Sequence, residues 1–165
     1  MTKKSSGAGP TRATAALTKA EIDFTVHEYE HDQTSESYGL EAAYALAVPP
    51  AKVFKTLVTD VDGDLVVALV PVEGRLRLKA LAAAVGGRKA DLADADRAER
   101  ATGYVLGGIS PVGTKKHLPT VLDVSATDLD RIYVSGGRRG LELALAPSDL
   151  ASYTKARLAP IARAD

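Results

Sequence analysis

A lysine within an otherwise apolar stretch is the first residue whose chemistry needs an explanation. In residues 53–58 the two-residue period of a strand places Lys55 on the same face as Val53 and Leu57. A cation on such a face must reach solvent or meet an anion in a pocket. Alternatively, Lys55 protects an exposed strand edge against aggregation, and the sequence leaves both interpretations open. Thr56 should face the other side, but its backbone could contribute to a site at a bulge or strand end.

A glycine-rich segment, residues 107–113, is the second candidate. Glycines such as Gly107 and Gly108 let the backbone approach a ligand closely and present its N–H groups. Such donors can stabilise a carbonyl oxygen that becomes negative during acyl transfer. An ordinary tight loop is the simpler interpretation. Residues 115–117, Lys-Lys-His, form a small basic patch that suits phosphate or is a solvated turn.

Two arginines, a glutamate and two tyrosines complete the candidates. Arg138 and Arg139 lie in an expected hairpin turn, where they are either simply exposed or close to an RNA backbone. Glu142 follows them and could lie at the mouth of a pocket. Tyr29 and Tyr38 could stack on a base or form a pocket wall. Because aromatic residues are few and Trp is absent, we expect no broad base-stacking platform.

The residue types that are absent narrow the chemistry. The chain has no Cys, which excludes disulfides, thiolate metal sites and a cysteine nucleophile. It also lacks the serine-hydrolase, P-loop, zinc-protease and dinucleotide-binding motifs. His27 and His31 have metal-ligand spacing only on a helix, and His27 lies in an expected strand. We therefore expect no metal site and no cofactor.

Composition limits the partners. The 165 residues contain 21 basic and 21 acidic side chains, so bulk attraction cannot hold nucleic acid, and we expect no DNA partner. Contact with RNA must come from local patches or be strengthened by another protein. No apolar run is long enough to cross a membrane, and the basic N-terminus lacks the apolar core of a signal peptide. These features predict a soluble cytoplasmic protein without a membrane partner.

Several short elements must position these residues. Helices are expected from Thr11 or Thr14 to residue 20, and over residues 38–47, 76–85, 94–101 and 147–155. Strands are expected over residues 24–29, 53–61, 65–70, 120–124, 132–135 and 141–145. Asp62-Gly63 and residues 136–140 should close two hairpins. The pattern predicts one α+β domain over residues 13–165 with a mixed, largely antiparallel sheet, after a disordered tail of residues 1–12.

Four separated motifs in one order resemble a known family. They comprise residues 29–32, residues 55–57, residues 102–111 with 113 and 115–116, and residues 132–137 with 139–141. In order and spacing they are similar to the YbaK/EbsC family of bacterial Cys-tRNA(Pro) deacylases, from about Thr14 to the C-terminus. The resemblance implies the editing-domain fold of prolyl-tRNA synthetases, a curled sheet or partial barrel wrapped by helices.

The resemblance also implies a site and a mechanism. Lys55, Gly107 and Gly108 would be catalytic, with Lys55 contacting the aminoacyl-adenosine end. The implied substrate-binding residues are Tyr29, Tyr38, Thr56, Ile109, Ser110, Pro111 and Glu142. Close relatives often carry Phe at the position of Tyr38 and Asp at that of Glu142, so pocket dimensions could differ. The substrate's own cysteine thiol would attack its carbonyl.

The implied partners are Cys-tRNA(Pro), and also Cys-tRNA(Cys), together with prolyl-tRNA synthetase. Three alternatives stay open at this point. The protein could clear Ala-tRNA(Pro), or be a non-catalytic module that binds tRNA or a synthetase. The third, a small-molecule hydrolase, is disfavoured because the nucleophile motifs are missing.

Overall fold

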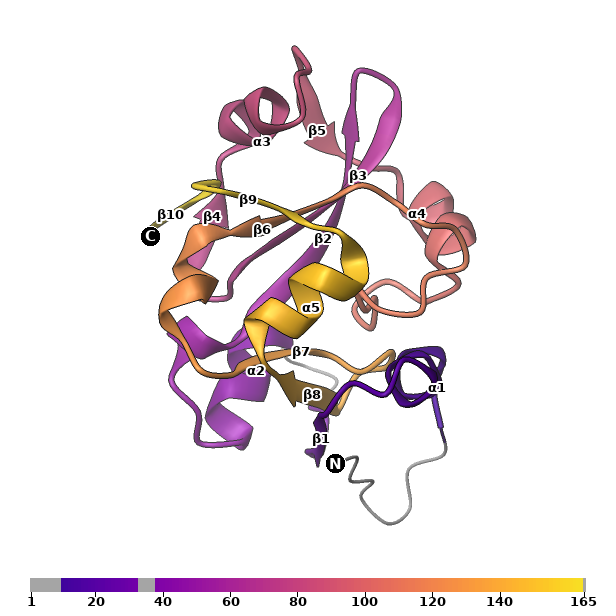
Figure 1. The fold of residues 1–165 in the computed structure, drawn as a ribbon, viewed down its shortest axis with the longest axis vertical. Coiled ribbons are helices and arrows are strands. Elements are labelled where there is room, and N and C mark those ends of the chain that lie inside the picture. The colour runs from indigo at the N-terminus through magenta and orange to yellow at the C-terminus, as the bar shows by residue number, and fades with distance from the viewer. Residues whose placement is uncertain (1–9, 33–37, 165) are drawn as a thin grey trace.

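The computed structural model describes residues 10–32 and 38–164, which form three β-sheets with helices packed on them (Figure 1). The largest sheet has the strand order β5-β2-β3-β6-β9, and the second has the order β1-β8-β7. The strands of the large sheet are β2 (Phe54–Val61), β3 (Asp64–Pro71), β5 (Ala90–Leu92), β6 (Thr120–Asp123) and β9 (Arg157–Ala159). The other strands are β1 (Thr25–Glu28), β7 (Ile132–Ser135), β8 (Leu141–Leu145), and the pair β4 (Gly74–Leu76) and β10 (Ala162–Ala164).

The long hairpin of β2 and β3 is the centre of the fold. The strands pair antiparallel from Phe54 opposite Pro71 to Val61 opposite Asp64. Asp62 and Gly63 form the turn with φ of 52° and 96°, and two positive φ values are what this two-residue turn requires. Because β6 runs parallel to β3 and β9 parallel to β6, the sheet is mixed. It stays open, with β5 and β9 at its edges.

Helices cover both faces of this sheet. They are α1 (Arg12–Lys19), α2 (Tyr38–Ala45), α3 (Leu78–Ala84), α4 (Ala95–Thr102) and α5 (Pro147–Thr154). On one face, Phe54 packs in a core with Leu17 of α1, Leu143 of the second sheet and Leu150 of α5. On the other face, Leu81 of α3 closes a smaller core. Burial of these apolar side chains is the main favourable contribution to folding.

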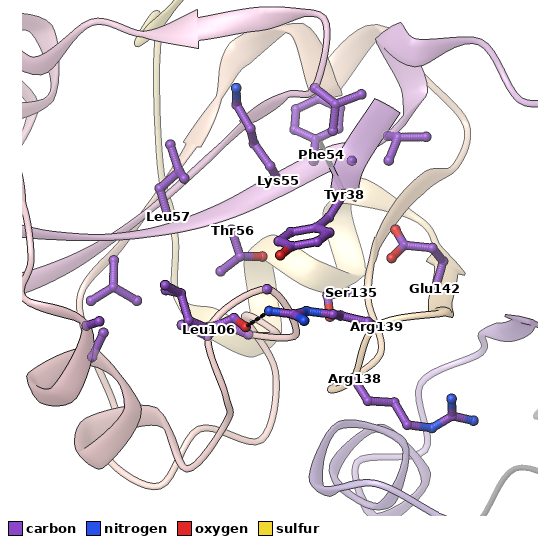
Figure 2. A pocket seen from close by; sticks show the side chains of 18 of the residues that line it. Tyr38, Phe54, Lys55, Thr56, Leu57, Leu106, Ser135, Arg138, Arg139 and Glu142 are labelled. Carbon is purple, nitrogen blue, oxygen red and sulfur yellow. Dashed lines mark hydrogen bonds between the residues drawn. The ribbon is translucent and has the colours of Figure 1, made fainter. Parts of the chain in front are cut away.

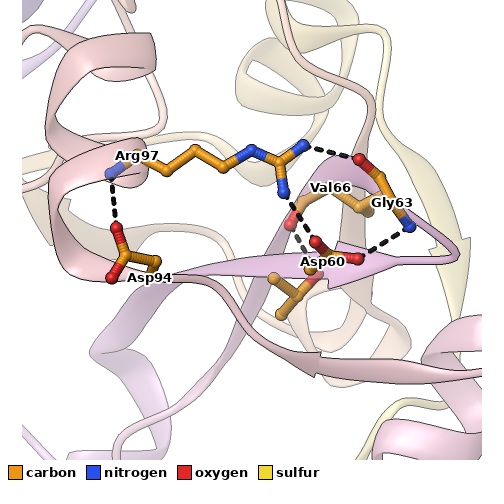
Figure 3. A network of polar contacts seen from close by, with 6 residues as sticks. Asp60, Gly63, Val66, Asp94 and Arg97 are labelled. Atoms are coloured by element: carbon orange, nitrogen blue, oxygen red, sulfur yellow. Dashed lines mark hydrogen bonds and ion pairs between the residues drawn. The ribbon is translucent and has the colours of Figure 1, made fainter.

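A polar network fixes α4 to the tip of the central hairpin (Figure 3). The guanidinium group of Arg97 donates to the Asp60 carboxylate at 2.6 Å and to the Gly63 carbonyl at 2.5 Å. Asp94 caps the helix by accepting from the Arg97 backbone N–H at 3.1 Å. The hairpin turn is itself closed by Gly63 N–H donating to Asp60. The first turns of α4 are thereby held beside β2.

The N-terminal helix begins with a capping box. The Thr11 side chain accepts from the Thr14 backbone N–H, and Thr14 accepts from that of Thr11. The Thr11 hydroxyl also donates to the Gly136 carbonyl at 2.6 Å, which attaches α1 to the loop between β7 and β8. Residues 1–9 of the expected disordered tail lie outside the described residues. No helix in the described part of the chain is long and apolar enough to cross a bilayer.

The α+β fold with a mixed, largely antiparallel sheet is confirmed, and the ends of its elements shift by a few residues. α3 begins at Leu78 rather than at residue 76, because residues 74–76 form β4. The structure adds four three-residue strands that had not been predicted: β4, β5, β9 and β10. Strands this short show no hydrophobic period, so their partners determine them rather than their own sequence.

Candidate active site

A pocket of about 440 Å³ lies along β2, between the glycine-rich segment and the β7–β8 hairpin (Figure 2). Seven of the ten predicted site residues line it: Tyr29, Tyr38, Lys55, Thr56, Gly107, Ile109 and Glu142. Gly108, Ser110 and Pro111 do not line it. Segments far apart in the sequence, from β1 to β8, therefore form one cavity of a size typical for small-ligand sites.

Lys55 borders this pocket from the beginning of β2 and is half-buried. Its ammonium group donates to the Gly74 carbonyl at 2.9 Å. In Figure 2 the side chain points away from Leu106, which directly precedes the glycine-rich segment. Lys55 and the glycine-rich segment thus line one pocket, but the ammonium group of Lys55 does not extend across the pocket to that segment. An ammonium ion bonds more strongly to an anion than to a neutral carbonyl, so a ligand phosphate can compete with Gly74.

Thr56 lies at an open strand edge. The Val53 carbonyl accepts from Val72 of the β3 side, whereas the Val58 carbonyl accepts from Ala93 beside β5. Because backbone groups alternate in an antiparallel ladder, the N–H and C=O of Thr56 point to the β5 side. β5 pairs only with residues 59–61, so no described strand covers this edge at Thr56. Lys55 and Thr56, predicted on opposite faces, can therefore line the same pocket.

The side chain of Thr56 is also without a partner among the described residues. Its hydroxyl oxygen is buried and makes no hydrogen bond there. A buried polar atom left unpaired costs about 1–3 kcal/mol, so such an atom at a pocket wall indicates a place for a ligand group. Thr56 thus offers a hydroxyl, an N–H and a carbonyl to whatever enters the pocket.

The glycine-rich segment forms a wall of the pocket through Gly107. Gly107 has φ of 91°, and a Cβ added there would collide with the Arg139 guanidinium. The Gly108 N–H, expected to face a ligand, donates instead to the Val105 carbonyl at 2.8 Å. Of Gly107 and Gly108, Gly107 therefore remains the candidate whose backbone N–H can donate to a ligand. Gly108 is needed for space, because a Cβ there would meet the Arg138 backbone.

Ser110 and Pro111 lie behind the pocket wall. Both are buried, and the Ser110 hydroxyl accepts from the Val112 N–H at 3.2 Å. The Tyr104 hydroxyl donates to the Val112 carbonyl at 2.5 Å and holds the same turn. These contacts position Gly107 and Ile109 rather than exposing Ser110 to a ligand.

A carboxyl group is buried at the end of the pocket nearest the second sheet. Glu142 is 8% exposed, and burial raises its pKa to about 8. A neutral carboxyl group at pH 7 can both donate and accept a hydrogen bond. The nearby Tyr29 has its pKa raised to about 12, mainly by burial and further by the Glu142 charge, so its hydroxyl stays protonated.

Arg139 joins three parts of the pocket rim. Its guanidinium donates to the Leu106 carbonyl at 2.9 Å and lies 4.4 Å from the centre of the Tyr38 ring (Figure 2). This cation–π contact links the β7–β8 turn to α2, while the hydrogen bond links it to the glycine-rich segment. The neighbouring Arg138 differs, because its guanidinium pairs with Glu28 at 3.1 Å.

Several lining residues were not predicted. Ser135 pairs directly with Glu142 in the β7–β8 register, and that register could have identified it. Phe54 and Leu57 lie in the same predicted strand as Lys55, one residue before it and two after it, so that strand could have identified them. Leu92 and Ala95 have no sequence signal, because β5 and the start of α4 are brought to β2 only by tertiary contacts.

The pocket can bind and orient an activated acyl group but contains few groups for nucleophilic catalysis. The chain has no Cys, and none of its three histidines, which all lie in the described part of the chain, lines the pocket. The described residues contain no group of three or more His, Asp or Glu arranged to hold a metal ion. The pocket presents a lysine, two arginines, backbone N–H groups, hydroxyl groups and a buried carboxyl group.

Comparisons with known proteins identify related chains. Residues 34–153 match the family model of the aminoacyl-tRNA editing domain. The chain is 39% identical over 137 residues to EbsC of Enterococcus faecalis, assigned as a Cys-tRNA(Pro)/Cys-tRNA(Cys) deacylase, and the match covers 81% of this chain and 83% of EbsC. It is 34% identical over 98 residues to proline–tRNA ligase of Moorella thermoacetica, covering 59% of this chain and 17% of the ligase.

The fold comparison agrees with the sequence comparison. A solved structure assigned as a trans-editing enzyme for prolyl-tRNA synthetase superposes with a TM-score of 0.80 at 26% identity. That match covers 92% of this chain and 95% of the other. Sequence and structure comparisons thus converge on one family.

Proposed function

The chain belongs to the aminoacyl-tRNA editing domain family and is an aminoacyl-tRNA deacylase, and we propose that it removes cysteine from mischarged tRNA(Pro). The observation that carries this substrate is a pocket without cysteine or histidine that still gathers donors for an acyl group. A pocket that holds no activated nucleophile of its own can cleave an ester whose own side chain, here the cysteine thiol, is the nucleophile. The similarity to EbsC supports the same choice.

In the proposed reaction the cysteine thiol, after losing its proton, attacks the carbonyl carbon of its own ester. The carbon–sulfur bond forms, the ester bond breaks, and the tRNA 3′ oxygen leaves with a proton, so the released product is a cyclic thioester. An ester is already activated, so the protein supplies mainly orientation and charge stabilisation. No base on the protein is required to activate water.

Each part of the pocket has a role in this proposal. Lys55 exchanges the Gly74 carbonyl for the terminal nucleotide and positions it. The N–H groups of Gly107 and of Thr56 at the open strand edge stabilise the developing oxyanion. Glu142 and Tyr29 hold the amino-acid end through hydrogen bonds.

A substrate panel tests the proposal. Deacylation of Cys-, Ser- and Ala-tRNA(Pro) is measured with the isolated protein and with prolyl-tRNA synthetase added. Because serine lacks the thiol, we expect Ser-tRNA(Pro) to react at least about a hundredfold more slowly than Cys-tRNA(Pro), a difference of about 2.7 kcal/mol in the barrier. Equal rates for the two would mean attack by water or by the protein, and faster Ala-tRNA(Pro) turnover would assign the protein to alanine editing.

Prolyl-tRNA synthetase is the second proposed partner. The relative from Moorella thermoacetica is a proline–tRNA ligase, and a chain of zero formal net charge should hold tRNA weakly without help. The synthetase arm of the panel should therefore lower the KM for tRNA without changing the order of the three substrates.

A further inference from the structure

The second half of the motif at residues 29–32 takes no part in the proposed reaction. Tyr29 lines the pocket, whereas neither His31 nor Asp32 is among the described residues that line it. Both nonetheless contact one side chain of α2. His31 Nδ1 lies 2.7 Å from Oε1 of the Glu41 carboxylate, and the Asp32 backbone N–H donates to Oε2 at 2.6 Å. One carboxylate thus attaches α2 to the segment that follows β1.

The contact between His31 and Glu41 is largely shielded from water. Their side chains are 15% and 11% exposed. Polar pairs at exposed sites contribute little, because water and salt compete for the same groups, whereas a largely buried carboxylate must keep its partners. The residues that α2 itself buries are Ala42 and Ala43, which remove little apolar area from water. The polar contact is therefore a main attachment of the first turn of α2.

Tyr38, at the start of α2, is held by the same contact. It lies three residues before Glu41, so the two side chains are neighbours on the helix surface. The Tyr38 ring contacts the His31 ring, with the ring centres 5.4 Å apart and the planes at 59°. The Arg139 guanidinium, 4.4 Å from the centre of the Tyr38 ring, contacts it as well. Tyr38 is thus oriented by His31 together with Arg139.

The position of the Tyr38 ring matters for the reaction. Figure 2 shows this ring in the pocket between Thr56 and Glu142. The proposed reaction assigns the developing oxyanion to Thr56 and the amino-acid end to Glu142. A misplacement of about 1 Å can lower a rate by about 10²-fold, because the reacting atoms lose their alignment. A group that fixes Tyr38 would therefore contribute to the rate of the chemical step.

We propose that His31 is a positioning residue for the deacylation, which acts by fixing the Tyr38 ring over the pocket with the help of Glu41. The inference rests on the proposed function, because it takes the cysteinyl ester to lie beside Tyr38. His31 itself touches no substrate. Because the phosphates of tRNA are held by cations elsewhere, loss of the His31 contact lowers kcat and leaves KM nearly unchanged.

The first experiment compares kcat and KM for Cys-tRNA(Pro) in three variants. His31→Phe and Glu41→Ala each break the polar contact and should lower kcat by roughly tenfold, with KM changed less than about twofold. Glu41→Gln should restore most of kcat. A carboxamide can still accept from the Asp32 N–H, and it can donate to Nδ1 of the other His31 tautomer. A purely structural role would lower stability without this division between kcat and KM.

A double-substitution cycle tests whether Tyr38 transmits the effect. Tyr38→Ala removes the ring, so adding His31→Phe to it should cause no further loss of kcat. A further loss as large as that caused by His31→Phe alone would overturn the inference, because His31 would then act independently of Tyr38. Wild-type kcat in the His31→Phe protein would also overturn it, as would a Glu41→Gln protein as slow as Glu41→Ala.

His27→Phe is the matched control. His27 Nε2 lies 2.7 Å from the Thr25 hydroxyl, and its ring centre is 5.1 Å from that of Tyr133, so it makes the same kinds of contact as His31. It does not line the pocket, and its variant should keep the wild-type kcat. An equal loss of kcat in His27→Phe and His31→Phe would indicate a general loss of packing and would contradict the positioning role.

A spectroscopic measurement separates this inference from the proposed function. The Nε–H resonance of Arg139 reports the position of the Tyr38 ring, which the guanidinium contacts. Without substrate, His31→Phe and Glu41→Ala should shift this NMR resonance, whereas Glu41→Gln and His27→Phe should leave it near its wild-type position. If it shifts in this way but the wild-type protein does not deacylate Cys-tRNA(Pro), the positioning of Tyr38 stands and the proposed function fails. An unshifted resonance in His31→Phe would overturn the inference even for an active deacylase.

Discussion

Lys55 is the residue on which the proposed catalysis depends most directly. Among the described residues that line the pocket it is the one lysine. Its ammonium group donates to a neutral carbonyl, which a substrate phosphate can replace. Lys55→Ala should lower kcat/KM for Cys-tRNA(Pro) by roughly 10²-fold, the scale for losing a group that positions the substrate. The free energy of unfolding should fall by only about 1 kcal/mol, for one lost hydrogen bond. Deacylation kinetics and urea denaturation measure the two effects.

Lys52→Ala is the matched control for this change. Lys52 is exposed, lies three residues earlier, and does not line the pocket. The Lys52→Ala variant should keep the wild-type kcat/KM for Cys-tRNA(Pro). Near-normal turnover by a folded Lys55→Ala protein would contradict the assigned role.

The buried carboxyl group of Glu142 makes stability depend on pH. Burial raises its pKa from 4.5 to about 8, so the folded protein binds more protons than the unfolded chain between these values. The free energy of unfolding should therefore decrease as pH rises from about 4.5 to about 8 and stay low above that. Glu142→Gln keeps the shape but removes the ionisation, so its stability advantage over wild type should grow across this window. Urea denaturation in buffers spanning the window measures the difference.

Glu73→Gln, at an exposed position, serves as the control and should follow the wild-type curve. A constant difference between Glu142→Gln and wild type over the whole range would show that Glu142 ionises in the folded protein as readily as in the unfolded chain.

At the scale of elements, Arg139 couples the β7–β8 turn to the two other walls of the pocket. Arg139→Met keeps the aliphatic stem but loses the bond to the Leu106 carbonyl and the charge over Tyr38. Because these contacts are partly exposed, stability should fall by about 1 kcal/mol or less. The freed segment should exchange its amide hydrogens faster at residues 105–110, and kcat/KM should drop by roughly tenfold, about 1.4 kcal/mol.

Arg138→Met provides the comparison for this exchange measurement. It removes the ion pair with Glu28 instead, so residues 105–110 should keep their exchange rates. Equal acceleration of that segment in both variants would show that Arg139 does not hold it specifically.

The elements themselves show what the sequence could predict. The central hairpin was predicted because Asp-Gly between two apolar runs is typical of a two-residue hairpin turn, in which both residues have positive φ. Seven of the ten residues that the motifs predicted for the site line one pocket. The Gly108 N–H was expected to face a ligand and instead closes a turn with Val105. β5 and Leu92 could not be predicted, because a three-residue strand is determined by its partner. The strand edge at Thr56 is open because β5 is too short to reach it, and no local sequence pattern encodes the length of β5.

At the scale of the whole molecule, the balance of 21 basic and 21 acidic residues determines how tRNA is held. Only local patches can attract the phosphate backbone. Arg12 and residues 115–117 form one such patch, since the Arg12 side chain donates to the Gly113 carbonyl at 3.1 Å and Lys115 and Lys116 are exposed. Their backbone is fixed by bonds from Lys115 N–H to Thr102 and from Lys116 N–H to Ala101.

This distribution of charge predicts a shallow salt dependence for tRNA binding by the isolated protein. Each contacted phosphate contributes about −0.7 to −0.9 to the slope of log K against log salt concentration, so a patch of a few cations should give a slope of roughly −2 to −3. Lys115→Gln combined with Lys116→Gln should make the slope less negative by about 1 to 2. The control is Lys79→Gln combined with Lys89→Gln. Both lysines are exposed but lie outside this patch, so this variant should leave the slope unchanged. A steep slope that both double variants share would mean that tRNA is gripped elsewhere on the molecule.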